Sequence, residues 1–220
     1  MTIRKDLEVL HSHGLLHRTH GGVLPVNGGA LADPTLREKE ELHRKEKQRI
    51  GTAAAGLVKE GQVVVLDSGT TTTRTARMLR DFTNVTIITN AVNIATELAG
   101  ASPEVILTGG MLRKNSFSLV GPIAEETLHR LNADILFLGV DGFDVQYGLT
   151  TPNLLEAKVN RAMVDIAKRV IAVCDSSKFG RRSLSLIAPT AAIHQVITDP
   201  QISQSDLRAL KKAGIEVTLV

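Results

Sequence analysis

A short segment rich in hydroxyl groups, residues 67–73, has the residue types and the position of an anion-binding turn. It follows the apolar run at 62–66 and opens a helical pattern at 75–79. An anion is favoured there, because the N–H groups of a first helical turn have no partner within the helix and the helix dipole adds partial positive charge. Gly69 lets the backbone approach a ligand closely, and the threonine hydroxyl groups add donors. The segment therefore predicts a site for a phosphate group on a small molecule.

Two other interpretations of this turn compete with a phosphate site. A nucleotide-hydrolysing P-loop is disfavoured, because no lysine follows in the spacing G-x-x-x-x-G-K-[ST]. An ordinary helix-capping turn would have a similar composition, so the residue types alone do not separate it from a phosphate site.

The elements that must position this turn are those of an α/β protein. From residue 62 onward short apolar runs alternate with helical patterns, which is typical of a mostly parallel sheet flanked by helices. One helix is predicted over 154–168, with Leu155, Val159, Ala162 and Ile166 on the face that packs against the sheet. The predicted strands are 63–66, 85–89, 104–108, 135–140, 170–174, 195–198 and 216–219.

Five of the predicted strands end in small or polar residues. Ligands of open parallel sheets bind beyond the carboxyl ends of the strands, so we expect the five loops to converge on one pocket. Each loop alone would be weak support, since loops are commonly polar and rich in glycine. The loops are residues 67–69, 89–90, 108–110, 141–142 and 175–178.

The first 24 residues follow a different pattern. A helix beginning after Thr2 is followed by a strand, a turn and a strand at 15–23, which together are half of a winged helix-turn-helix. Two further helices would have to precede this half, so the sequence predicts a fragment or the product of a late start. The expected division is a partial winged helix-turn-helix at 1–24, a linker at 25–34 and one large domain at 35–220. The charged run that opens the large domain, 35–58, is expected to be a helix with a solvated face and a structural role.

The composition of the chain limits the kinds of partner that it is expected to bind. Its 220 residues carry 26 Lys and Arg against 23 Asp and Glu, and a net charge of +3 does not by itself indicate nucleic acid. Aromatic residues are 3% of the chain and tryptophan is absent, so recognition is expected to depend on hydrogen bonds and charge rather than on stacking. No apolar stretch has the length of a membrane span, which predicts a soluble protein.

Cysteine and histidine give no sign of a metal or a cofactor. The single cysteine, Cys174, lies in an apolar run and is predicted to be a buried, inert thiol, which fits a reducing cytoplasm. His11, His13, His17 and His20 cluster near the start of the chain without cysteine or carboxylate partners at ligand spacing, so no metal site is expected.

Several motifs in register resemble the DeoR family of bacterial transcriptional repressors. The resemblance covers nearly the whole chain, and the series is far more specific than any one motif. The motifs are T-I-R-K-D-L at 2–7, D-S-G-T-T-T at 67–72, T-N at 89–90, T-G-G at 108–110, L-G-V-D-G at 138–142, E-A at 156–157 and D-S-S-K-F at 175–179.

The resemblance implies a fold and a function. The fold would be that of ribose-5-phosphate isomerase and glucosamine-6-phosphate deaminase, here used as a sensor domain. A phosphorylated sugar would bind this domain and release the repressor from its operator DNA. The motifs at 138–141 and 175–178 resemble those of the amino-sugar-responsive members. The resemblance also implies a cytoplasmic homo-oligomer, a dimer or tetramer, without enzymatic activity.

Site residues carried over from the family fall into three groups. For the effector, the phosphate would be held by Gly69, Thr70, Thr71 and Thr72 with Lys178 as the neutralising charge, and the sugar would be bound by Asp67, Thr89, Asn90, Asp141 and Glu156. Arg113 could reach either end, and Ser68, Gly109, Gly110 and Gly142 complete the set expected around the effector. For DNA, the expected residues are Thr2, Arg4, Lys5, Arg18 and Gly21.

Two further functions compete with a repressor. A sugar-phosphate isomerase or deaminase of the same fold would need a general base, and Asp141 or Glu156 could serve. The helix and wing at the start of the chain favour the regulator, because an isomerase has no use for them. An assembly module with a vestigial pocket is the third hypothesis, and it predicts no stabilisation by any phosphorylated sugar.

Overall fold

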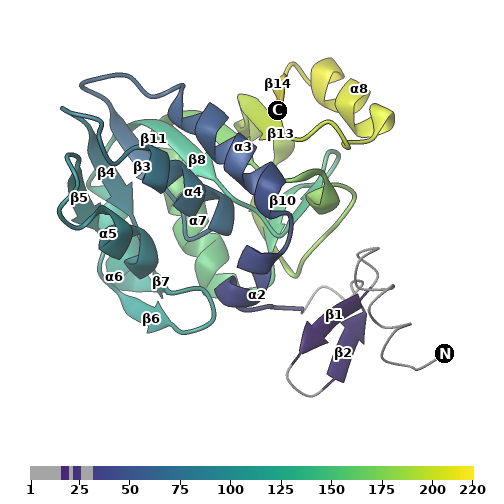
Figure 1. Cartoon of the computed structure of the whole chain (residues 1–220), viewed down its shortest axis with the longest axis horizontal. Coiled ribbons are helices and arrows are strands. Elements are labelled where there is room, and N and C mark those ends of the chain that lie inside the picture. Colours follow the sequence, from purple (N-terminus) through teal and green to yellow (C-terminus); the bar gives the residue numbers. More distant parts are fainter. Residues whose placement is uncertain (1–15, 20–21, 26–31) are drawn as a thin grey trace.

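A computed structural model of the chain, which describes residues 16–19, 22–25 and 32–220, contains a seven-stranded parallel sheet (Figure 1). The strand order is β14-β13-β11-β8-β3-β4-β5, and every neighbouring pair is parallel. Strand order reverses between β3 and β8, where a ligand pocket is expected in such sheets. The strands are β3 (Val63–Leu66), β4 (Thr86–Thr89), β5 (Glu104–Leu107), β8 (Ala133–Leu138), β11 (Ala167–Val173), β13 (Gln195–Thr198) and β14 (Glu216–Leu219).

Helices cover both faces of the sheet, because successive strand residues point to opposite faces. Val64 and Leu66 pack in one core with helices α3 (Arg44–Ala55), α4 (Thr70–Met78) and α5 (Val92–Leu98). Val65 and Leu136 pack in the other core, to which α6 (Pro122–His129), α7 (Leu154–Ile166) and α8 (Gln204–Lys212) contribute. Figure 1 shows α3 and α4 on the near face of the sheet and α7 on the far face.

All seven predicted strands are confirmed, with ends that shift by a few residues. The predicted helix at 154–168 is α7, and its Val159 and Ala162 are buried in the core as expected. The strand-turn-strand predicted at 15–23 is the antiparallel pair β1 (Leu16–Thr19) and β2 (Gly22–Pro25). The helix predicted before it lies outside the described residues.

Five short strands were not predicted. A three-stranded antiparallel sheet has the order β12-β10-β9, and β6 pairs with β7 in a two-stranded hairpin. The alternation of apolar and polar residues in these strands is too short to be distinguished from the pattern of a loop. The strands are β6 (Met111–Arg113), β7 (Ser118–Val120), β9 (Gly142–Asp144), β10 (Gly148–Thr151) and β12 (Ser185–Ala188).

The charged run at 35–58 differs from its prediction in two respects. It forms two helices, α2 (Leu36–Glu41) and α3, which are separated at His43, a residue with a left-handed φ of 53°. The expected solvated face is wrong for Lys47, which is only 4% exposed, because it lies on the buried side of α3 together with Ile50 and Ala54. None of the helices in the described part of the chain is long and apolar enough to cross a membrane.

Candidate functional site

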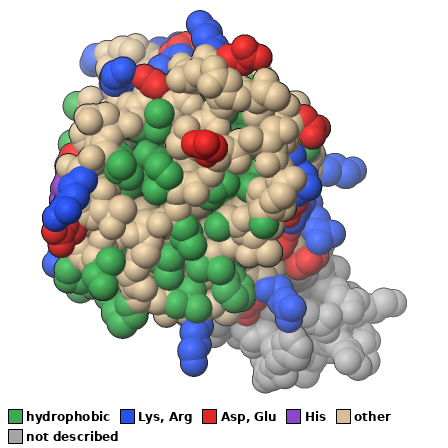
Figure 2. All heavy atoms as spheres, turned by 90° about the vertical axis from the view of Figure 1, so that its left-hand side faces the viewer, with side chains coloured by type: hydrophobic (Ala, Val, Ile, Leu, Met, Phe, Trp, Pro, Cys, Tyr) green, Lys and Arg blue, Asp and Glu red, His purple; other side chains and the backbone are tan. Residues whose placement is uncertain are grey.

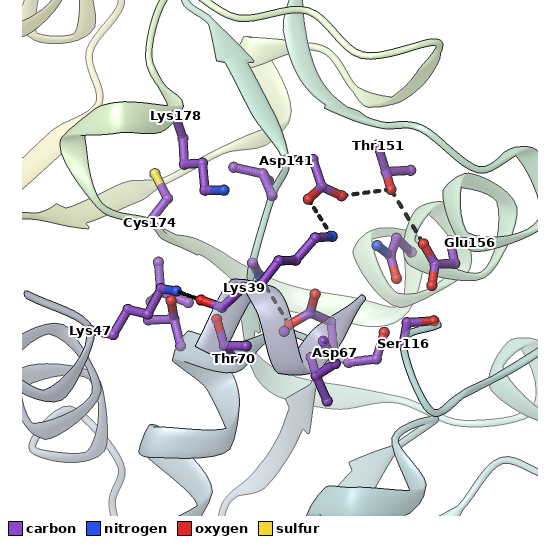
Figure 3. A pocket seen from close by; sticks show the side chains of 18 of the residues that line it. Lys39, Lys47, Asp67, Thr70, Ser116, Asp141, Thr151, Glu156, Cys174 and Lys178 are labelled. Atoms are coloured by element: carbon purple, nitrogen blue, oxygen red, sulfur yellow. Dashed lines mark hydrogen bonds and ion pairs between the residues drawn. The ribbon is translucent and has the colours of Figure 1, made fainter. Parts of the chain in front are cut away.

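One pocket lies at the carboxyl ends of β3, β8 and β11 and beneath α2 (Figure 3). Its enclosed volume is about 60 Å³, enough for only a few water molecules. The lining residues are Leu36, Lys39, Lys47, Asp67, Ser68, Gly69, Thr70, Thr71, Ser116, Gly139, Val140, Asp141, Thr151, Glu156, Asn160, Val173, Cys174, Asp175 and Lys178.

The hydroxyl-rich turn after β3 forms one wall of the pocket. The Thr72 hydroxyl accepts a 3.0 Å hydrogen bond from the backbone N–H of Gly69 and contacts the carbonyl oxygen of Asp67 at 3.0 Å. Thr72 thus closes the turn from within and is fully buried, while Thr70 and Thr71 line the pocket. The first-turn N–H groups of α4 have no acceptor within the helix, so this end of α4 presents donors and partial positive charge to the cavity.

Four carboxyl groups line the pocket, those of Asp67, Asp141, Glu156 and Asp175. Burial raises the pKa of Asp67 to about 7, although the carboxylate accepts a 3.1 Å hydrogen bond from the N–H of Gly139. Burial also disfavours the charged form of Asp141, but the nearby cations Lys39 and Lys178 outweigh it and hold the pKa of Asp141 below its usual value. The other two, Glu156 and Asp175, are almost fully buried. The pocket can therefore hold neutral and charged carboxyl groups side by side at neutral pH.

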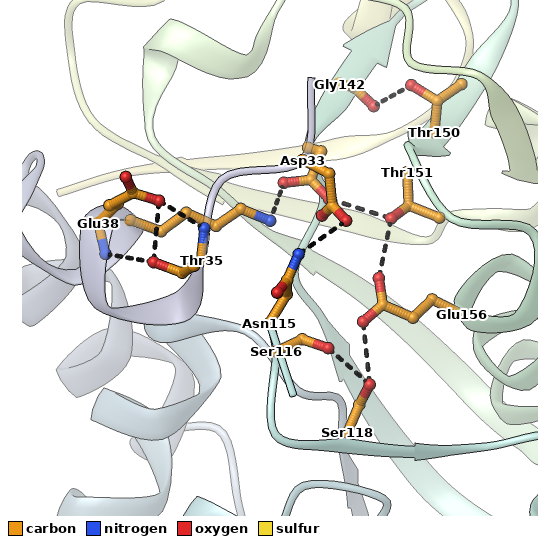
Figure 4. Close-up of polar contacts among 12 residues, drawn as sticks. Asp33, Thr35, Glu38, Asn115, Ser116, Ser118, Gly142, Thr150, Thr151 and Glu156 are labelled. Carbon is orange, nitrogen blue, oxygen red and sulfur yellow. Dashed lines mark hydrogen bonds and ion pairs between the residues drawn. The ribbon is translucent and has the colours of Figure 1, made fainter. Parts of the chain in front are cut away.

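Hydrogen bonds join the carboxylates Asp141 and Glu156 through one hydroxyl group. The Thr151 hydroxyl lies 3.0 Å from Asp141 Oδ2 and 3.4 Å from Glu156 Oε2, and Ser118 donates to Glu156 Oε1 at 2.9 Å (Figure 4). Arg113 adds an ion pair of 3.0 Å to Glu156 and a second one to Asp33. The network fixes the acidic side of the pocket before any ligand binds.

Three lysines provide the positive side. Lys39 reaches from α2 across the pocket, and its Nζ lies 2.6 Å from Asp141 Oδ1 (Figure 3). Burial opposes the charge of Lys39, but Asp141, Glu156 and Asp67 surround it and raise its pKa above the usual value. Burial and the nearby Lys178 lower the pKa of Lys47 to about 8.

The structure brings eight of the predicted effector residues together in the pocket. Seven others do not line it. Thr89 bonds to the carbonyl oxygen of Leu66 at 2.7 Å, and Asn90 holds β7 through Leu119. Those in the pocket are Asp67, Ser68, Gly69, Thr70, Thr71, Asp141, Glu156 and Lys178, and those outside its lining are Thr72, Thr89, Asn90, Gly109, Gly110, Arg113 and Gly142.

The three glycines outside the lining shape the neighbouring chain. Gly109 and Gly110 have φ values of 72° and 116° and lead into the β6–β7 hairpin. A Cβ atom on Gly142 would lie 2.6 Å from the carbonyl oxygen of Arg181, so this position needs glycine for a close backbone approach.

The sequence did not single out five polar lining residues: Lys39, Lys47, Ser116, Thr151 and Asn160. Lys39 and Lys47 belong to a run of mixed charges that is usually solvated, and only the packing of α2 and α3 brings them to the pocket. Ser116 and Thr151 lie on segments whose strands were not predicted. Cys174 is buried as expected, and burial raises the pKa of its thiol.

The residues expected to contact DNA lie largely outside the described residues. Within the described part of the chain, no group of three His, Cys, Asp or Glu side chains could hold a metal ion. Arg18 lies on β1, of which only the backbone is described, and Thr2, Arg4, Lys5 and Gly21 are not described.

Comparison with known families matches both parts of the chain. Residues 1–27 match the "DeoR-like helix-turn-helix domain", and residues 42–200 match the "DeoR C terminal sensor domain".

Curated relatives extend over nearly the full chain. A protein of Escherichia coli O157:H7 named as an aga operon transcriptional repressor is 42% identical over 100% of this chain and 82% of its own length. The transcriptional regulator GlpR of Haloferax volcanii is 41% identical over 98% of this chain and 84% of its own. The transcriptional repressor AccR of Agrobacterium fabrum is 38% identical over 90% and 77%. All three are named as regulators, none as an enzyme.

The solved structures that match this chain are more distant in sequence than the curated relatives. Ribose 5-phosphate isomerase A from Methanocaldococcus jannaschii aligns at 17% identity and a TM-score of 0.47, over 62% of this chain and 54% of that one. The eIF2B delta subunit from Chaetomium thermophilum aligns at 20% identity and a TM-score of 0.46, over 64% and 51%. The chain thus spans about half the length of these proteins, and the likeness carries no conclusion about activity. The two family matches and the three curated relatives together establish that this chain belongs to the DeoR family of helix-turn-helix transcriptional regulators.

Proposed function

We propose that this chain is a repressor of carbohydrate-metabolism genes whose sensor domain binds a phosphorylated sugar or amino sugar. Binding of that effector weakens the hold of the N-terminal region on operator DNA. The names of the relatives support the first part, because two of the three are named as repressors and one is named for the aga operon.

The main support for the proposal is that the pocket has a positively charged side and an acidic side. The start of α4 faces the cavity with Thr70 and Thr71, and Lys178 lies on the same cavity, so a phosphate group would meet donors and positive charge there. The carboxyl groups of Asp141 and Glu156 lie on the side reached by Lys39 and can accept hydrogen bonds from sugar hydroxyl or amino groups. An anion subsite and an acceptor subsite in one cavity fit a phosphorylated sugar.

We further propose that the chain divides into a partial winged helix-turn-helix at 1–24, a linker at 25–34 and a sensor domain at 35–220, and that it acts in the cytoplasm. The hairpin of β1 and β2 supplies the wing of the first part. The limits of the two family matches, 27 and 42, support a division between them.

Calorimetric titration tests the effector. Glucose, galactose, glucosamine and galactosamine 6-phosphates are each compared with the unphosphorylated sugar. Binding of at least one phosphorylated member, with no binding of its unphosphorylated form, is the expected result. If none of the phosphorylated sugars binds, the proposal is contradicted. Conversion of a bound sugar phosphate to another product would contradict a purely regulatory role.

We also propose that the chain assembles with a second copy of itself through an apolar face. Figure 2 shows hydrophobic side chains gathered on the side of the molecule that carries β5, α5, β6 and α6. Exposed members of this apolar face are Ile106, Leu107, Met111, Leu112 and Ile123, and β5 is the edge strand of the large sheet. A contiguous apolar surface at an open sheet edge is typical of a protein interface. The two copies would bury it by a symmetric contact.

A further inference from the structure

Side chains of α2 occupy part of the pocket. The remaining space of about 60 Å³ is far below the roughly 300–1,000 Å³ of sites that enclose small organic ligands. On the other side of α2 lies a second hollow of about 550 Å³, and the two hollows share only Leu36 and Thr70 in their linings. Leu36 and Lys39, both on α2, therefore help divide one larger space into two, and a sugar phosphate needs part of the volume that α2 occupies.

Lys39 makes the contact that places α2 in the pocket. Its ammonium group pairs with Asp141 at 2.6 Å, and the carbonyl oxygen of Lys39 accepts a hydrogen bond from Lys47. Two further contacts attach the segment at its ends: the Leu36 N–H donates to the carbonyl oxygen of Asn115 at 2.7 Å, and Glu40 pairs with Arg74 at 3.0 Å. Lys39 is thus the one cation that α2 places against the acidic side of the pocket.

Removal of Lys39 would leave Asp141 as a buried carboxylate without its closest positive partner. A sugar hydroxyl group can donate a hydrogen bond to Asp141 but cannot replace the lost charge. A protonated amino group can supply both the hydrogen bond and the positive charge. An effector with an amine at this position exchanges one cation for another, whereas a neutral sugar leaves the carboxylate with only the more distant charge of Lys178.

We propose that Lys39 is an internal substitute for the amino group of the effector, so that an amino-sugar phosphate displaces it from Asp141 and thereby releases α2 from the pocket. This inference rests on the proposed function and adds to it the effector class and the moving element. Among the described residues, α2 is the first helix after the segment that matches the helix-turn-helix domain, so its movement out of the pocket can be passed along the chain to the DNA-binding region.

Binding measurements on three variants of the full chain test the substitution. Lys39→Met keeps most of the side-chain volume and removes the competing charge, so glucosamine or galactosamine 6-phosphate should bind at least tenfold more tightly than to the parent. Asp141→Asn should remove most of the preference for these amino sugars over glucose and galactose 6-phosphates. Lys45→Met, at an exposed position on α3, is the matched control and should change neither affinity.

Hydrogen exchange of the α2 amides gives an independent readout. Amides of residues 36–41 should exchange faster when the parent is saturated with the amino-sugar phosphate, while the amides at the start of α4 become slower. Greater protection of α2 on binding would mean that the helix closes over the ligand, and the inference would be overturned.

The outcomes separate this inference from the function on which it rests. A parent that binds glucose and glucosamine 6-phosphates equally, with no gain in Lys39→Met, keeps the proposed function and overturns the role of Lys39. A parent and variants that bind no phosphorylated sugar overturn both. If Lys39→Met does not fold because Asp141 is left unpaired, Lys39→Met/Asp141→Asn removes both charges. That double variant should bind glucose 6-phosphate more tightly than the parent, and no gain would overturn the inference.

Discussion

The N–H of Gly139 donates a hydrogen bond of 3.1 Å to Oδ1 of Asp67, which links the loops after β8 and β3 at the floor of the pocket. A Cβ atom at position 139 would lie 3.3 Å from both carboxylate oxygens of Asp67. The two loops approach this closely because β3 and β8 are neighbours in the sheet and end at the same edge. Asp67 is consequently buried, and its carboxyl group can accept this hydrogen bond whether or not it is charged.

The burial of Asp67 should appear in the pH dependence of stability. Its pKa of about 7 in the folded protein lies above the ordinary value of 3.8, so the folded state binds the extra proton between about pH 4 and pH 7. Its contribution to stability is therefore complete below about pH 4 and is lost as the pH rises to 7. Asp67→Asn can still accept from Gly139 and should raise the free energy of unfolding at pH 8, by up to about 4 kcal/mol. Urea unfolding at pH 5 and pH 8 measures the difference.

Asp81→Asn, at an exposed position, is the control for this titration and should leave the pH dependence unchanged. The assignment fails if Asp67→Asn loses stability equally at both pH values, because the side chain would then stabilise the fold in its charged form.

Effector binding should depend on Thr71. This residue is almost fully buried in the pocket wall at the start of α4, so Thr71→Glu places a bulky negative charge where a phosphate group would bind. We expect loss of binding of the phosphorylated sugar by more than a hundredfold, with a thermal unfolding midpoint that still reports a folded protein. Calorimetric titration of Thr71→Glu beside Thr52→Glu, an exposed threonine on α3, measures it. Binding as tight as that of the parent would show that the phosphate lies elsewhere.

The sequence predicted the large sheet and half of the pocket because both depend on short-range patterns. Runs such as 63–66 are apolar on both sides of the strand, and such runs fit only a sheet with two covered faces. Topology then gathers the loops after these strands at one edge, so the sequence pattern alone is enough to place Asp67, Asp141 and Lys178 together.

Lys39 could not be found in the same way. Its neighbours in the sequence are charged, and its position depends on contacts of α2 with residues far along the chain: Lys39 itself pairs with Asp141, and Leu36 of the same helix bonds to Asn115. Thr89 and Asn90 show the opposite case. They stand at a strand end as the pattern requires, but their side chains are used to hold the neighbouring backbone rather than to line the cavity.

Close backbone packing beside the pocket should make Gly142 intolerant of substitution. In Gly142→Ala the new methyl group would lie 2.6 Å from the carbonyl oxygen of Arg181 and 2.7 Å from the Thr150 hydroxyl. Since one contact is with backbone, β9 must shift, and we expect a loss of about 2–4 kcal/mol in the free energy of unfolding. Gly56→Ala is the matched control, because Gly56 has helical φ and ψ angles of −64° and −12° and its nearest contact would be 3.5 Å. Chemical denaturation should show Gly56→Ala at least as stable as the parent, and equal effects of the two changes would contradict the packing argument.

The apolar face around β5 and β6 predicts a concentration-dependent assembly. Ile123 is 65% exposed at the start of α6, and Leu112 on β6 is 49% exposed. Ile123→Glu and Leu112→Glu each place a charge in the centre of a symmetric contact, where it would meet its own copy, so both should shift the protein toward the monomer. Sedimentation velocity over a range of protein concentrations measures the shift. Leu184→Glu tests specificity, because Leu184 is as exposed as Leu112 but is not part of the apolar face. A monomeric parent would rule out the contact, and an equal effect of Leu184→Glu would place the interface elsewhere.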